Sequence, residues 1–252
     1  GYTVSDALEF YAFGNYSNSK ADGNFFYRYP GNGVIENIRL EDGSEYNFLE
    51  IYPGGFTPLF KGKVIDYSGV GGFRGDLGGG FSYDFSGRYG LSKIEYTLLN
   101  TVNPSLGPDT PTEFRPGDLI NREGQFQADF VQLVDLDYLA GPLTIGFGGT
   151  YLRESYELVE GEPLSYAAGP WAQADPFDFC DGMTGPTLAG MGIAGLDCTD
   201  PDDPVFQVLG VGANGFPGYS PEFSGKYKRS SHGVYVDVSA DITEKLFLEA
   251  AA

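Results

Sequence analysis

The chain has 252 residues, is rich in Gly (38), Tyr (18) and Phe (20), and carries a formal net charge of −20. Because binding to the nucleic-acid backbone requires clustered lysines and arginines, the charge argues against a nucleic-acid partner. No segment approaches the roughly 18 to 20 consecutive apolar residues of a membrane helix, and the composition is typical of strands joined by turns and loops.

Seven strand-like segments follow one another along the chain. They cover residues 7–18, 63–75, 81–98, 119–134, 143–157, 226–240, and 245 onward. Three links are short and rich in Gly, Asp or Pro, namely 76–80, 135–142 and 241–244. They alternate with three long links, 19–62, 99–118 and 158–225. Antiparallel strands joined in this way place every long link at one end, which is typical of outer-membrane β-barrels with short periplasmic turns and long extracellular loops.

Apolar and polar residues alternate where the strand period is clear. Leu143, Ile145, Phe147 and Tyr151 share one face of their segment, and Val234, Val236 and Val238 share one face of theirs. The aromatic residues Phe81, Tyr83, Tyr96, Tyr138 and Tyr151 are interpreted as girdle residues at a membrane interface. A soluble or surface-anchored β-sandwich that binds glycans would show the same alternation, and it remains the alternative.

Two local features of the strands are less clear. In the first segment, Leu8, Phe10 and Ala12 compete with Tyr11 and Phe13 for the outward face. In the third, the apolar phase changes near Ser92 and Lys93, and the change predicts a β-bulge there.

Both ends of the chain interrupt strand-like sequence, and about seven strands cannot close even the smallest barrel of about eight. We therefore expect residues 1–252 to form part of one β-barrel domain whose remaining strands lie elsewhere. The fold class predicted is all-β, an antiparallel transmembrane barrel sector.

Several fragments resemble TonB-dependent outer-membrane receptors. The segment Asn100–Gly107 (NTVNPSLG), followed by 110–114 (TPTEF), is similar to a loop that recurs in this family. Further similar fragments are 25–28 (FFYR), 52–59 (YPGGFTPL), 83–86 (YDFS) and 89–90 (YG). The likeness extends over most of the chain, from about residue 7 to 250.

The resemblance implies a 22-stranded barrel in the bacterial outer membrane, filled by an N-terminal plug domain. It implies energy-coupled uptake of a scarce nutrient, such as an iron chelate, a vitamin or an oligosaccharide. The partners implied are the plug domain, the inner-membrane TonB complex and the nutrient, with the lipid bilayer and lipopolysaccharide around the barrel. The chain departs from the family pattern because no plug and no TonB-contacting box are recognisable in it.

Catalytic chemistry is not predicted, and neither is a cofactor. The single histidine, His232, would need a neighbouring serine such as Ser230 or Ser231 and a carboxylate such as Asp237. On a strand, however, Asp237 lies on the opposite face from His232, so a catalytic triad fails on local geometry. An enzyme, including a barrel hydrolase, is therefore disfavoured.

Ligand binding is assigned to aromatic residues of the long links. Aromatic rings stack on sugars and planar ligands, and an arginine pairs with ligand carboxylates. The candidates are Phe25, Phe26, Tyr27, Arg28, Tyr29, Tyr52 and Trp171. Packing of the loops against themselves is an equally good interpretation.

The link 158–225 is acidic and contains both cysteines. Between Val159 and Phe223 it has ten Asp and Glu residues and no Lys or Arg, a composition that repels anions or bridges to lipopolysaccharide through divalent ions. Asp197, Asp200, Asp202 and Asp203 are weak calcium candidates, because they do not follow the EF-hand pattern, and no metal site is predicted. A disulfide between Cys180 and Cys198 is predicted, with two free thiols as the alternative.

Overall fold

All 252 residues are described by the computed structural model, in which 50% of the chain lies in strands and 7% in helices. The protein is all-β and mostly antiparallel, as the sequence predicts. None of its helices is long and apolar enough to span a membrane.

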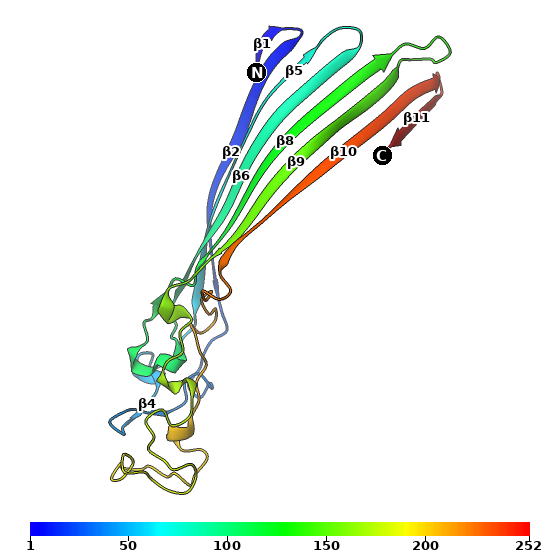
Figure 1. Cartoon of the computed structure of the whole chain (residues 1–252). Coiled ribbons are helices and arrows are strands. Elements are labelled where there is room, and N and C mark those ends of the chain that lie inside the picture. The colour runs from blue at the N-terminus through cyan, green and yellow to red at the C-terminus, as the bar shows by residue number, and fades with distance from the viewer.

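A single antiparallel sheet of nine strands forms the body of the molecule (Figure 1). Six of them, the long strands, have 17 to 19 residues each, and each pairs with the long strand that follows it in the chain. The nine strands are β1 (Tyr2–Ser5), β2 (Leu8–Asn24), β5 (Leu59–Asp76), β6 (Phe81–Leu99), β7 (Glu113–Phe114), β8 (Asp118–Val134), β9 (Leu143–Val159), β10 (Gly225–Thr243) and β11 (Leu246–Ala251).

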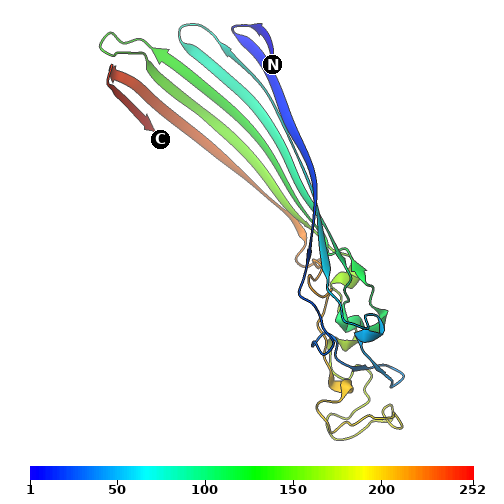
Figure 2. The same cartoon turned by 180° about the vertical axis from the view of Figure 1, so that it is seen from behind.

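The connections confirm the predicted asymmetry. The short turns β5–β6, β8–β9 and β10–β11 lie at one end of the sheet, and the three long loops gather at the other (Figures 1 and 2). The loops contain a small sheet of β3 (Ile38–Arg39) and β4 (Glu45–Tyr46), and five 3-10 helices: η1 (Phe48–Glu50), η2 (Pro104–Asp109), η3 (Pro163–Ser165), η4 (Pro170–Ala172) and η5 (Pro204–Phe206). In the β5–β6 turn, Gly78, Gly79 and Gly80 all have positive φ, a conformation that favours glycine.

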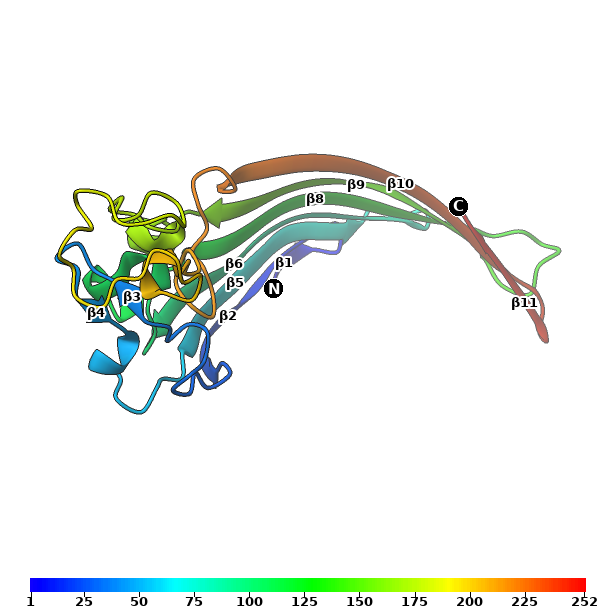
Figure 3. The same cartoon turned by 90° about the horizontal axis from the view of Figure 1, so that it is seen from below.

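The sheet is open and forms one layer. Views from opposite sides show no second sheet packed on either face (Figures 1 and 2), and the strands arch along their length (Figure 3). The two buried clusters of the molecule both involve the loops.

The pairing register defines the two faces of the sheet. One cross-strand row contains Phe10, Phe73, Phe85, Ala128, Gly149 and Val234, and the face that bears it is called the belt face. The opposite face, which bears Arg74 and Asp129, is called the network face. This register settles the first long strand, where Leu8, Phe10 and Ala12 lie on the belt face and Tyr11 and Phe13 on the network face.

An apolar belt covers the half of the belt face nearest the turns. Its side chains include no charged residue. They belong to Leu8–Tyr16, Tyr67–Phe73, Phe81–Leu91, Phe126–Val134, Leu143–Tyr151 and Val234–Ile242, taking every second residue. Many are exposed, among them Tyr16, Phe126 and Val234, the last at 87%.

The network face is polar at the same level. Tyr11 donates a hydrogen bond to Asp84 (2.5 Å), Arg74 pairs with Glu9 (3.0 Å), and the Tyr235 hydroxyl donates to Asp129 (2.8 Å). Nearer the loops this face becomes apolar, and Leu98 is fully buried there against loop residues.

The predicted bulge near Ser92 and Lys93 is absent, and the change of polarity along each face explains the pattern that suggested it. β6 pairs with β5 and β8 in unbroken register through Ser92 and Lys93. The apolar phase changes because the belt face leaves the apolar belt at Leu91, while the network face packs on the loops at Tyr96 and Leu98. A change of surroundings produces the same sequence signal as a bulge.

Tyr96 corrects a second prediction. It lies on the network face, where its ring stacks on Phe60 with centroids 4.9 Å apart and packs near Phe216, so it is not a girdle residue of the belt face. Phe81, Tyr83 and Tyr151 do lie on the belt face, and Tyr138 is exposed in the β8–β9 turn.

Candidate functional site

The three long loops fold together into one body, called the loop assembly, which comprises residues 25–58, 100–117 and 160–224 (Figure 1). Its main core draws on all three loops and consists of Ile35, Ile38, Tyr46, Phe48, Phe56, Val102, Trp171 and Leu209. Because the loops bury these side chains against one another, the assembly has the packing of a small domain.

Asn103, in the middle of the segment Asn100–Gly107, connects two of these loops. Its side-chain amide donates to the carbonyl oxygens of Leu164 and Ala167, both at 2.9 Å. Its side-chain oxygen accepts from the Ser105 hydroxyl (2.9 Å) and the Gly212 N–H (3.0 Å). A buried amide with these four bonds has its hydrogen-bonding capacity satisfied, which gives the segment a structural role in this chain.

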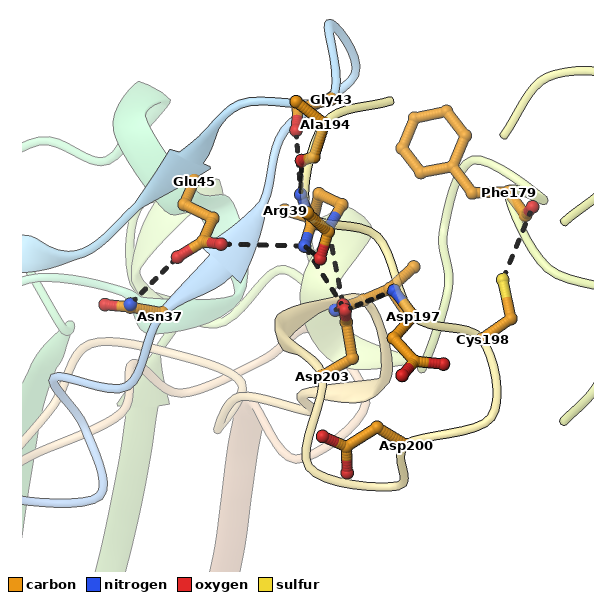
Figure 4. A network of polar contacts seen from close by, with 12 residues as sticks. Asn37, Arg39, Gly43, Glu45, Phe179, Ala194, Asp197, Cys198, Asp200 and Asp203 are labelled. Atoms are coloured by element: carbon orange, nitrogen blue, oxygen red, sulfur yellow. Dashed lines mark hydrogen bonds and ion pairs between the residues drawn. The ribbon is translucent and has the colours of Figure 1, made fainter. Parts of the chain in front are cut away.

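Arg39 is the second connection between the loops (Figure 4). Its side chain is almost completely buried, and its Nε and Nη2 atoms each lie 3.3 Å from an oxygen of Asp203. The guanidinium also donates to the carbonyl oxygens of Gly43 (3.0 Å) and Gly195 (3.1 Å). A buried charge of this kind depends on its partners, because it has lost its hydration.

Asp203 is held by more than the arginine. It caps η5 by accepting from the Val205 N–H (2.9 Å), and it accepts from the Asp197 N–H (2.8 Å). Burial by itself raises the pKa of this carboxyl, but the two backbone donors and Arg39 outweigh burial and lower the pKa below its usual 3.8.

The lowered pKa predicts that the loop assembly weakens in acid. Asp203 stabilises the fold fully above pH 3.8, and its contribution is lost as the pH falls through the lowered folded-state pKa. We expect the free energy of unfolding, followed by Trp171 fluorescence, to drop as the pH falls from about 4 to about 2. The variant Asp203→Asn, which does not titrate at this position, should drop less over the same range, and an equal drop in both proteins would contradict the prediction.

Of the predicted ligand-binding residues, Trp171 is buried, and Phe25 and Tyr52 are partly buried against the two cores. Trp171 is only 5% exposed, its Nε1 donates to the Arg39 carbonyl (3.0 Å), and its ring lies against Gly107, where a Cβ would overlap it. The rings of Phe25 and Phe60 lie 5.7 Å apart in the smaller core, and those of Tyr52 and Phe56 lie 5.0 Å apart.

The other four form an exposed strip at the start of the first loop, at Phe26–Tyr29. The rings of Phe26, Tyr27 and Tyr29 are 70%, 46% and 48% exposed. Arg28 donates to Asn214 (2.7 Å) and to the Phe26 carbonyl (2.5 Å), so part of its hydrogen-bonding capacity is used internally. Of the predicted set, the three exposed rings are therefore the ones open to a ligand.

The calcium candidates do not come together as a ligand set. Asp203 faces Arg39, whereas Asp197 accepts from Thr199 and Asp200 accepts from the Asp202 N–H. No group of three or more His, Cys, Asp or Glu residues is placed to hold a metal ion. The aspartates act in this structure as partners of an arginine and of turns.

The predicted disulfide is confirmed. Cys180 and Cys198 are bonded, with their Cα atoms 5.6 Å apart, and they close the outer part of the third loop. His232 lies on the belt face beside the apolar belt, with its ring 4.9 Å from that of its strand partner Tyr151.

Sequence reasoning missed Arg39 and Asn103. A signal for Arg39 was present, because an arginine between Ile38 and Leu40 is a cation in an apolar run, and such residues are seldom buried without a partner.

No protein-family model, curated protein or solved structure matches the chain.

Proposed function

We propose that this chain is a sector of the wall of an outer-membrane β-barrel, with the apolar belt in contact with lipid. The observation that carries the proposal is an exposed apolar belt that spans seven to eleven residues of each long strand, nine on most of them. A tilted membrane strand needs about 9 to 11 residues. The polar network face then lies toward the barrel interior.

The slope of the belt supports the same proposal. A straight cross-strand row from Asn18, the first polar residue beyond the belt on β2, reaches Lys226 on β10. On β10 the first polar residue is instead His232, six residues nearer the turns (232 − 226). From β2 to β10 the edge of the belt therefore shifts by six residues along the strands, about 20 Å, over five strand spacings, about 24 Å. If the strands tilt by roughly 40° from the membrane normal, as they do in membrane barrels, this edge lies parallel to the membrane plane.

The open sheet fits a wall sector. An edge strand presents a row of unpaired N–H and C=O groups, which is costly in lipid. The proposal therefore includes further strands that close the barrel. A soluble glycan-binding sandwich, in contrast, would have to cover Val234, Val236 and Val238, which are all exposed.

We further propose that the barrel is a TonB-dependent receptor that takes up a scarce nutrient, an iron chelate, a vitamin or an oligosaccharide. This part rests on the family-like segments and on the loop assembly at one end of the sheet. The exposed rings of Phe26, Tyr27 and Tyr29 supply stacking surfaces for such a ligand.

Fluorescence quenching by brominated phosphatidylcholine tests the membrane proposal. Tryptophan is placed at Phe147 on the belt face or at Thr144 on the network face of the same strand, and Trp171 in the loop assembly serves as an internal reference. We expect quenching at position 147 and little at position 144. Equal quenching at both positions, or none at either, would show that the belt does not face lipid.

Growth tests the uptake proposal. Deletion of the gene in the producing bacterium should reduce growth when one of the three nutrient classes is limiting, and loss of the TonB complex should cause the same defect. Unimpaired growth under all three limitations would refute the receptor assignment and leave the membrane assignment intact.

A further inference from the structure

A cationic zone lies beside the apolar belt, on the same face of the sheet and toward the loops. It consists of the belt-face side chains of the long strands beyond the belt. Its cations are Lys20, Lys61, Lys63, Lys93, Arg122, Arg153, Lys226 and Lys228, and its acids are Asp22, Glu95, Asp118 and Glu157.

The charge of this zone is opposite to that of the rest of the protein. Eight cations against four acids give it an excess of four positive charges, whereas the whole chain carries −20. More than half of the 15 lysines and arginines of the chain lie in this zone. An acidic protein thus places more than half of its cations in a band directly next to the exposed apolar belt.

Several of these cations have no acidic partner. Lys63 pairs with Glu95 (3.1 Å), and Arg122 and Lys226 share Glu157. Lys20, Lys61, Arg153 and Lys228, in contrast, form no ion pair, although Lys61 is the strand partner of Asp22. Their charge is available to an anion from outside the chain.

A hollow of about 350 Å³ lies within the zone, next to β2 and β5. Lys20, Lys61, Lys63 and Arg115 line it together with Asp22 and Glu95. Lys63 and Arg115 already pair with acids, whereas Lys20 and Lys61 form no ion pair. Two available cations in one depression suit a phosphate group, because phosphate presents several acceptor oxygens.

The hollow lies just outside the headgroup layer of a bilayer, within reach of long side chains. Lys20 lies four residues beyond Tyr16, the last belt residue of β2, which is about 13 Å along the strand and roughly 10 Å above the belt at the tilt of a barrel strand. The headgroup layer is about 5 to 8 Å thick on each side of the hydrocarbon, and long lysine side chains reach toward it.

We propose that the cationic zone binds the phosphate groups of anionic lipid headgroups in the leaflet on the loop side. This inference rests on the proposed membrane location of the belt. In this proposal, lysines and arginines contact the phosphates directly. An acidic surface, in contrast, would bind them only through divalent cations.

Vesicles of two compositions test the inference. The complete barrel that contains this chain is refolded and added to phosphatidylcholine vesicles, or to vesicles in which about one third of the lipid is phosphatidylglycerol, and the partition coefficient is measured by flotation. One lysine at a membrane surface contributes about fivefold to such binding. We expect the preference for the anionic vesicles to fall about fivefold in Lys61→Gln and about 25-fold in Lys20→Gln/Lys61→Gln.

Arg229→Gln is the matched control. Arg229 is an exposed cation at a similar distance beyond the belt, but it lies on the network face beside Glu154, so its replacement should leave the preference unchanged. A further arm adds inorganic phosphate at constant ionic strength. We expect no competition beyond that of chloride, and selective competition would indicate a site for free phosphate and overturn the lipid assignment.

The outcomes distinguish failure of the headgroup site from failure of the proposed membrane location. Equal partitioning of the unmodified chain into both vesicles, or equal effects of Lys61→Gln and Arg229→Gln, would overturn the headgroup site while leaving the membrane belt in place. Failure to enter either vesicle would overturn the membrane belt itself, and with it the headgroup site.

Discussion

Replacement of Phe130 and Phe147 by arginine is expected to abolish stable membrane insertion. These two residues are strand partners at the centre of the apolar belt, and their rings stack 5.1 Å apart. An arginine facing lipid at the bilayer midplane costs about 2 to 4 kcal/mol. The double variant should therefore lose roughly 4 to 8 kcal/mol of the free energy of folding in lipid.

The matched control is Gln127→Arg/Thr150→Arg, which places two arginines on partners in the same two strands but on the network face. Both double variants bring two like charges together, so they differ mainly in which face receives the charge. Urea unfolding in phosphatidylcholine vesicles should show a large loss for the belt-face variant and a small one for the network-face variant. Similar losses would contradict a lipid-facing belt.

Replacement of Arg39 by methionine should destabilise the loop assembly by about 3 to 5 kcal/mol, the usual cost of leaving one member of a buried ion pair unpaired. Asp203 would keep its backbone donors but lose its only counter-charge within 4 Å. Unfolding of the assembly is followed through Trp171, whose indole donates to the Arg39 carbonyl.

Two further variants make the Arg39 result specific. Arg28→Met removes an arginine that hydrogen-bonds Asn214 near the surface, and its cost should be about 1 kcal/mol. Arg39→Met/Asp203→Asn removes both charges and should recover part of the loss. A cost for Arg39→Met no greater than that for Arg28→Met would show that the pair does not hold the loops together.

The belt variants test the sheet, and the Arg39 variants test the loop assembly. The proposed role of the belt is to contact lipid, whereas the Arg39 network joins the loops to one another. If the loops bind a ligand as proposed, loops that are already folded lose less conformational entropy on binding, and the core around Trp171 keeps these loops folded.

Local patterns were sufficient for the sheet. The alternation of Leu143, Ile145 and Phe147 with small polar residues predicts a two-faced strand, and the spacing of turn residues predicts which connections are short. Cys180 and Cys198 lie close together in the sequence, so their pairing was also within reach. Each of these features depends on neighbours along the chain.

The candidate site was less accessible to prediction. Phe26 and Tyr29 are exposed, whereas Trp171 and Tyr52 pack inward, although all four are aromatic residues in polar loops. Burial in the loop assembly depends on contacts between residues more than a hundred positions apart, such as Trp171 and Arg39. No local period records such contacts.

By itself, the sequence determined the all-β class, the order of the hairpins, the grouping of the long loops at one end and the disulfide. Only the tertiary structure decided which face of β2 belongs to the belt, why the phase of β6 changes, and that the lysines beyond the belt share one face. The physical reason is that strand formation and turns follow local periodicity, whereas register and burial come from pairing across strands. One residue of register shift exchanges the faces of a whole strand.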